Sequence, residues 1–94
     1  MNTGFEEVFV IRYTQDWAVS FERIDDFFRN DPEITPQAPG KYIYKTCEII
    51  LARLPDRRLG TLVFPRSRVE ISGMDEDAET IYRRFFLQFA SAGG

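Results

Sequence analysis

Apolar and aromatic side chains recur with two different periods along this chain, and the change of period separates predicted strands from predicted helices. Residues 6–14 combine β-branched and aromatic side chains and predict a strand. Residues 16–30 predict a helix with Asp16 as its N-cap. The apolar stripe of this helix consists of Trp17, Phe21, Ile24 and Phe28.

Prolines and short turns divide the middle of the chain. Residues 31–40 contain three prolines and end in glycine, so we expect a loop there. The next segments alternate with the period of a strand and predict a three-stranded meander. Its strands cover residues 41–54, 60–65 and 68–72, with turns at residues 55–56 and 65–67.

A second helix closes the chain. Asp75 is a suitable N-cap, and the acids after it favour the positive end of a helix dipole. The helix should end near Ala90 and leave residues 91–94 as a flexible tail. We therefore expect residues 1–94 to form a single α+β domain in the order β-α-β-β-β-α. Its four-stranded, mainly antiparallel sheet would carry both helices on one face.

The predicted strand over residues 41–54 has apolar side chains on both faces, because side chains alternate along a strand. Ile43, Cys47, Ile49 and Leu51 share one face, which we assign to the core. The opposite face holds Tyr42, Tyr44, Ile50, Ala52 and Leu54. Two helices cannot cover both faces, so we predict that this second face, or an open edge of the sheet, is an interaction surface.

Composition and charge exclude several classes of protein. Hydrophobic residues make up 44% and aromatic residues 15%, as expected of a globular protein with apolar surface to spare. Cys47 is the single cysteine, so an intramolecular disulfide is impossible and a reducing, cytoplasmic location is expected. The chain shows neither a secretion signal nor an apolar run of the roughly 18 residues that span a membrane.

Candidate chemistry is sparse. The absence of histidine removes the commonest general base and a frequent metal ligand, and no glycine-rich phosphate motif is present. Cys47 has the setting of a buried thiol, and the acids at residues 25–26 and 75–77 suit solvated helix surfaces. We predict no catalytic residue, metal or cofactor. An enzyme that uses carboxylates or Cys47 at a subunit interface is a competing hypothesis.

The charge is distributed unevenly. The net charge is −3, yet residues 41–73 hold seven bases against three acids. Basic and aromatic side chains together on a sheet are typical of proteins that bind single-stranded nucleic acid. The alternative function is therefore a nucleic-acid-binding domain, in which Tyr42 and Tyr44 could stack on bases. Its basic contacts would be Lys41, Lys45, Arg66 and Arg68.

One segment has a family resemblance. Residues 60–64, Ser67 and residues 69–73, with the helix that follows, are similar to the strand–strand–helix unit of a TATA-binding-protein half. The similarity covers roughly a third of the chain. The sequence has no second copy of the unit, and its net charge is negative. The resemblance implies two strands followed by a helix in this region.

These observations favour a small, non-enzymatic protein-interaction or assembly module. The expected partner is a second copy of the chain, giving a homodimer, or another protein. Nucleic acid is the alternative partner, and no contact with a membrane is expected.

Overall fold

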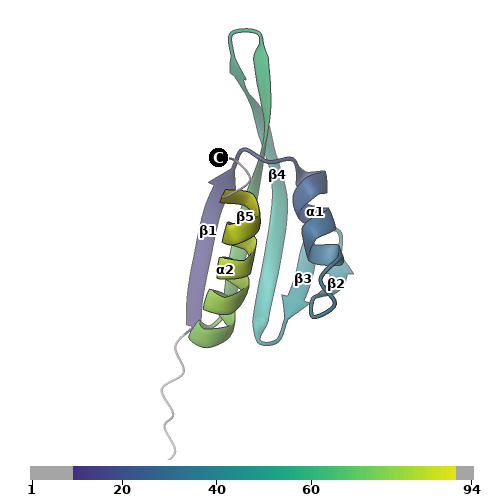
Figure 1. Ribbon diagram of the computed structural model, residues 1–94, viewed down its shortest axis with the longest axis vertical. Coiled ribbons are helices and arrows are strands. Elements are labelled where there is room, and N and C mark those ends of the chain that lie inside the picture. Colours follow the sequence, from purple (N-terminus) through teal and green to yellow (C-terminus); the bar gives the residue numbers. More distant parts are fainter. Residues whose placement is uncertain (1–9, 91–94) are drawn as a thin grey trace, which may run out of the picture.

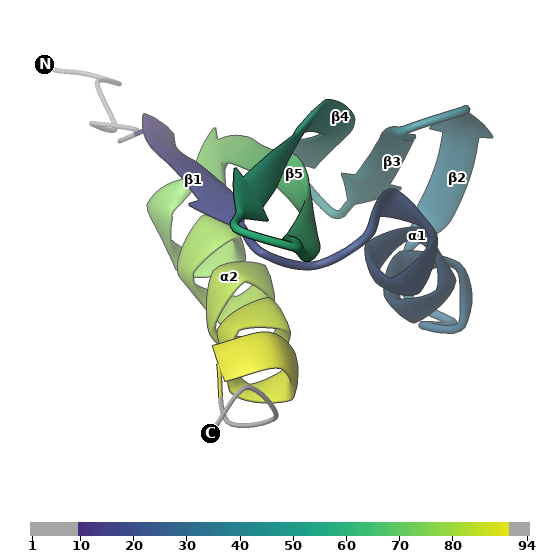
Figure 2. The ribbon, with the colours of Figure 1, turned by 90° about the horizontal axis from the view of Figure 1, so that it is seen from above.

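The computed structural model describes residues 10–90 as one antiparallel sheet with two helices (Figure 1). The elements are β1 (Val10–Trp17), α1 (Phe21–Arg29), β2 (Thr35–Ala38), β3 (Lys41–Tyr44), β4 (Cys47–Leu59), β5 (Leu62–Met74) and α2 (Asp75–Ala90). The sheet has five strands in the spatial order β1-β5-β4-β3-β2. Both helices lie on the same face (Figure 2). The α+β class and the antiparallel sheet are confirmed, whereas the predicted count of four strands is wrong.

The boundary between β1 and α1 differs from the prediction. β1 continues to Trp17, which pairs with Ser67 of β5. The predicted helix start at Asp16 is therefore wrong. Ser20 is the N-cap of α1, because its Oγ accepts a hydrogen bond from the backbone N–H of Arg23 at 3.2 Å. A spacing of four residues suits one side of a strand or of a helix, so periodicity alone did not locate this boundary. The remaining predicted positions, residues 6–9 and 91–94, lie outside the described residues.

The predicted strand over residues 41–54 is two strands, because the chain reverses direction at Lys45–Thr46. Lys45 has φ 52°, a left-handed conformation that is uncommon for residues other than glycine. The reversal places Tyr44 directly opposite Cys47, and directly opposed residues of an antiparallel pair point to the same face. The prediction that Tyr42 and Tyr44 face away from the core is therefore wrong.

A long hairpin replaces the two short turns predicted at residues 55–56 and 65–67. The chain passes Pro55 with a shift of register between Leu54 and Arg57, and it turns at Gly60, which has φ 64°. The outer parts of β4 and β5 project beyond the sheet as a two-stranded arm, residues 55–65 (Figure 1). Each strand of the arm pairs with only one other strand. A proline, which has no N–H to donate, can therefore be accommodated on the unpaired side or at the register shift.

The proline-rich segment also contains a strand. The predicted loop over residues 31–40 includes β2, which pairs with β3 at the edge of the sheet and carries Pro36. Gly40, with φ 76°, follows β2 and accepts a hydrogen bond from the N–H of Leu51 at 2.8 Å. The predicted strands over residues 60–65 and 68–72 are also wrong, because they form the single strand β5. The split of residues 41–54, this merger and the added edge strand together give the observed order β-α-β-β-β-β-α.

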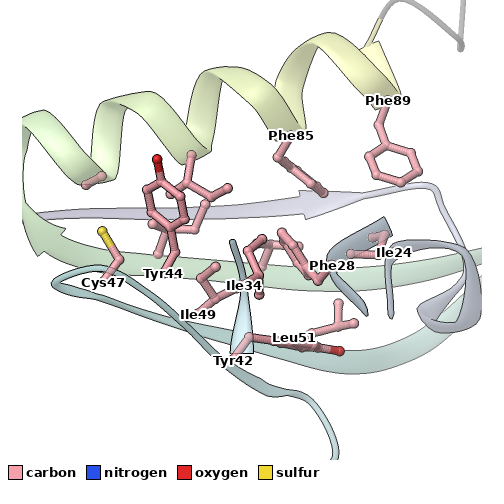
Figure 3. Packing of buried hydrophobic residues seen from close by; sticks show 14 of the residues in the cluster. Ile24, Phe28, Ile34, Tyr42, Tyr44, Cys47, Ile49, Leu51, Phe85 and Phe89 are labelled. Carbon is pink, nitrogen blue, oxygen red and sulfur yellow. The ribbon is translucent and has the colours of Figure 1, made fainter. Parts of the chain in front are cut away.

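The core lies between the sheet and the two helices (Figure 3). Phe28 of α1 and Phe85 of α2 stack with ring centroids 5.7 Å apart, so the helices meet through aromatic rings above the sheet. The predicted burial of Cys47, Ile49 and Leu51 is confirmed. Ile43, predicted to lie with them, is only partly buried because β3 turns it to the opposite face. Other buried residues include Val19, Ile24, Ile34, Tyr42, Tyr44, Ser67, Val69, Ile71, Ala78, Ile81 and Phe89.

Candidate functional site

The structure divides the predicted interaction surface between two faces of the sheet. Tyr42 and Tyr44 are 0% and 1% exposed beneath the helices. The hydroxyl of Tyr42 donates a hydrogen bond to the carboxylate of Asp25 on α1. Burial, reinforced by this hydrogen bond, raises the pKa of Tyr42 above its ordinary value. These tyrosines are core residues in this chain and do not form a surface.

Ile50, Ala52 and Leu54 lie on the open face, which the helices do not cover. In the register of the sheet, Ile50 is flanked by Lys41 on β3 and Glu70 on β5. Lys41 Nζ lies 3.2 Å from a carboxylate oxygen of Glu48, next to this stripe. Among the described residues, the apolar part of the open face is therefore a narrow stripe bordered by charges.

The four predicted nucleic-acid contacts do not gather into one basic surface. Arg68 and Arg66 both approach the carboxylate of Asp16, at 2.7 Å and 3.4 Å. The hydrogen bond from Arg68 is the main reason that the pKa of Asp16 is lowered. Lys41 is paired with Glu48, as described above, and Lys45 lies in the β3–β4 turn, at the end of the sheet away from the arm.

The residues considered for chemistry have structural surroundings. Cys47 is fully buried, and burial raises the pKa of its thiol, which keeps the sulfur protonated and weakly nucleophilic at neutral pH. Asp77 accepts a hydrogen bond from Thr46 Oγ1 at 2.7 Å. Asp25 binds Arg29 Nε at 3.0 Å as well as Tyr42. Within residues 10–90, no cluster of three or more acids and cysteines could hold a metal ion.

A hollow of about 740 Å³ lies between α1 and α2. Phe27 and Phe89 line it, and three of its charged groups, Arg84, Asp31 and Glu33, pair with one another. Arg84 lies 2.6 Å from Asp31 and 3.1 Å from Glu33. These ion pairs connect α2 to the segment after α1, and they account for these three charges without a ligand.

The outer side of β1 is a different kind of surface. β1 pairs with β5 on one side, and no other strand of residues 10–90 pairs with it on the other. α2 lies beneath it, with Tyr82 stacked on Tyr13 at a centroid distance of 4.3 Å. Phe86 lies 5.9 Å from the ring of Trp17 and remains 43% exposed. We call the outer side of β1, together with Tyr82 and Phe86, the β1 edge.

A shallow hollow of about 280 Å³ marks the β1 edge on the helix side. It is lined by Tyr13 of β1 and by the α2 residues Glu79, Tyr82, Arg83 and Phe86, which the helical repeat places on one flank. Sequence reasoning missed this site. The available signal was Phe86, a large aromatic residue outside the apolar face of its helix.

The arm supplies another exposed apolar surface. Leu59 and Leu62 face each other near the tip, and Leu62 is 59% exposed. Arg57 and Arg58 lie beside them on β4. The helices do not cover the arm (Figure 1), so its side chains contribute little to the core.

Comparison of the sequence with protein-family models and with curated proteins finds no match. Neither described helix is both long enough and apolar enough to cross a membrane.

Proposed function

We propose that this chain is a non-enzymatic protein-interaction module that forms a homodimer by pairing two β1 edges. The observation that carries the proposal is the outer side of β1, an eight-residue strand without a second strand neighbour among the described residues. Such an edge presents a row of backbone N–H and C=O groups that can pair with another strand. An identical strand satisfies them in an isologous contact.

Apolar side chains along this side of the molecule support the proposal. Val10 and Met74 lie opposite each other at the start of β1 and are 70% and 40% exposed. On the helix side, Phe86 is exposed next to Tyr82. Aromatic residues are enriched at protein interfaces, where they lose contact with water on association. A second copy placed against β1 would cover the aromatic pair beneath the joined sheet.

The symmetry of such a dimer follows from the edge. A two-fold axis perpendicular to the sheet makes the two β1 strands antiparallel and keeps all helices on one side. The two α2 helices then lie beside each other below the joined strands. The open face offers less apolar area for a second copy to cover, because charged residues border its apolar stripe at Ile50. The arm projects away from the sheet and is left available for another protein (Figure 1).

A non-enzymatic role is part of the proposal. It is supported by the buried thiol of Cys47 and by Asp25 and Asp77, whose carboxylates accept hydrogen bonds from Arg29 and Thr46. The same free cysteine supports a reducing, cytoplasmic location.

Three matched lysine substitutions test the proposal by sedimentation equilibrium. Thr14→Lys places a charge at the middle of the edge strand, Ile50→Lys does so on the open face, and Leu62→Lys does so on the arm. All three positions are at least partly exposed, and each variant gains the same charge. We expect wild type to be a dimer and Thr14→Lys to raise its dissociation constant at least tenfold, about 1.4 kcal/mol.

The two other variants should remain dimeric, and circular dichroism should show that all three are folded. A monomeric wild type would refute homodimer formation. Dissociation by Ile50→Lys or Leu62→Lys, with Thr14→Lys still dimeric, would move the interface to the open face or to the arm.

A further inference from the structure

Charge distribution along β1 restricts how two β1 edges can be aligned, and this inference rests on the proposed dimer. Arg12, Thr14 and Asp16 point to the open face, whereas Tyr13 points to the helix side. Because the proposed axis keeps the helices on one side, residues of the same face must lie opposite each other. The allowed registers therefore differ from one another by an even number of residues.

We propose that the two chains pair with Thr14 opposite the partner's Thr14. In this register Arg12 lies opposite the partner's Asp16, and by symmetry the contact occurs twice. Opposite charges that face each other across strands are stabilising, and paired threonines are favourable as well. On the helix side, Tyr13 then lies opposite the partner's Gln15, and Ile11 lies opposite the partner's Trp17.

The neighbouring registers lack these contacts. A shift by two residues moves Arg12 opposite the partner's Thr14 in one direction and opposite the partner's Ala18 in the other. A shift by four residues places Arg12 opposite the partner's Arg12, or Asp16 opposite the partner's Asp16. Like charges directly opposite each other are destabilising. Charge therefore selects one register among those that the faces allow.

The side chains are suited to this role within the monomer. Arg12 is exposed, and among residues 10–90 no acidic side chain pairs with it. Asp16 already accepts three hydrogen bonds, two from Arg68 at 2.7 Å and 3.2 Å and one from Arg66 at 3.4 Å. A carboxylate has about four acceptor positions, so one is left on Asp16 for an arginine across the interface. Arg68 and Arg66 hold the carboxylate on the open face, where the partner's Arg12 would reach it.

Disulfide crosslinking measures the register directly. With Thr14 opposite the partner's Thr14, the two Cα atoms would lie about 4.5–5.5 Å apart, within the range that a disulfide bridges. Two Arg12 residues would be offset by four residues, about 13 Å along the strands. Cys47 is fully buried, so it provides little background reaction.

We expect Thr14→Cys to form covalent dimers under mild oxidation at least tenfold faster than Arg12→Cys. A dimeric wild type combined with equal or faster crosslinking of Arg12→Cys would overturn the register and leave the proposed function standing. A monomeric wild type would overturn both.

Charge exchange provides a second measurement. Arg12→Glu and Asp16→Lys should each weaken the homodimer at least tenfold, because each places like charges opposite each other. An equimolar mixture should restore dimers, since Glu then faces Lys and the native Arg12 faces the native Asp16. Failure of the mixture to associate, with both variants folded by circular dichroism, would overturn the register. If Asp16→Lys does not fold because it loses Arg68 and Arg66, the crosslinking result decides.

Discussion

The reversal at Lys45–Thr46 makes an energetic prediction about two neighbouring side chains of β3. The structure buries Tyr44 beneath α2, with 1% of its surface exposed, and turns Ile43 to the open face. A continuous strand over residues 41–54 would instead place Ile43 in the core and Tyr44 outside it. Truncating each side chain to alanine therefore distinguishes the two arrangements.

Tyr44→Ala should lower the free energy of unfolding by about 3–5 kcal/mol, the usual cost of deleting a buried aromatic ring. The guanidinium of Arg84 lies 5.3 Å from the ring centroid, so a cation–π contact is lost as well. Ile43→Ala removes a partly exposed side chain and should cost about 1 kcal/mol. Since small domains have only about 5–15 kcal/mol of stability, the Tyr44 variant should be close to unfolding.

Urea titrations followed by circular dichroism measure both costs. With a slope of about 1–2 kcal/mol per molar urea, Tyr44→Ala should lower the midpoint by roughly 1.5–5 M and Ile43→Ala by about 1 M or less. Tyr44→Phe is the matched control that keeps the ring, and its midpoint should stay close to that of wild type. Protein concentration must be equal throughout, because the proposed dimerisation would add to apparent stability. A larger loss for Ile43→Ala than for Tyr44→Ala would refute the reversal at Lys45.

Two further predictions concern buried positions. Because the pKa of Tyr42 is raised above 10.0 in the folded state, its contribution to stability is complete below that pH and is lost as the pH rises further, by up to about 1.4 kcal/mol per pH unit. Urea titrations from about pH 8 to about pH 11 should show a smaller loss for Tyr42→Phe than for wild type, and equal losses would contradict the burial of this hydroxyl. Gly73→Ala should cost about 1–3 kcal/mol, since its Cβ would lie 2.6 Å from Cys47 Sγ and 2.8 Å from Cys47 Cα. Ser72→Ala, on the open face beside it, is the control, and equal melting temperatures for the two variants would count against this close approach.

The sequence determined those features that depend on local periodicity. The alternation of Cys47, Ile49 and Leu51 predicted the face of β4 that enters the core, and the structure confirms it. The last helix, observed from Asp75 to Ala90, was predicted to within about a residue, because its acids and its apolar stripe lie within a few turns of each other. Side chains close in sequence are sufficient for such features.

Tertiary structure decided the turns. Lys45–Thr46 carries no glycine, proline or asparagine, and Lys45 adopts its left-handed conformation where β3 and β4 pair on a shared core. In contrast, Pro55 predicted a turn, but the pairing of β4 with β5 continues past it with a shift of register between Leu54 and Arg57. A local signal is a preference of about 1 kcal/mol, which the pairing and burial of a whole strand can exceed.

The candidate site depended on strand order even more strongly. The composition of residues 10–17 is that of an ordinary strand, and nothing local distinguishes an edge strand from a central one. β1 becomes an edge because β5 alone pairs with it among the described residues, and α2 then brings Tyr82 and Phe86 beneath it. Strand order is set by contacts between residues far apart in sequence, so the surface proposed for dimerisation exists only in the folded chain.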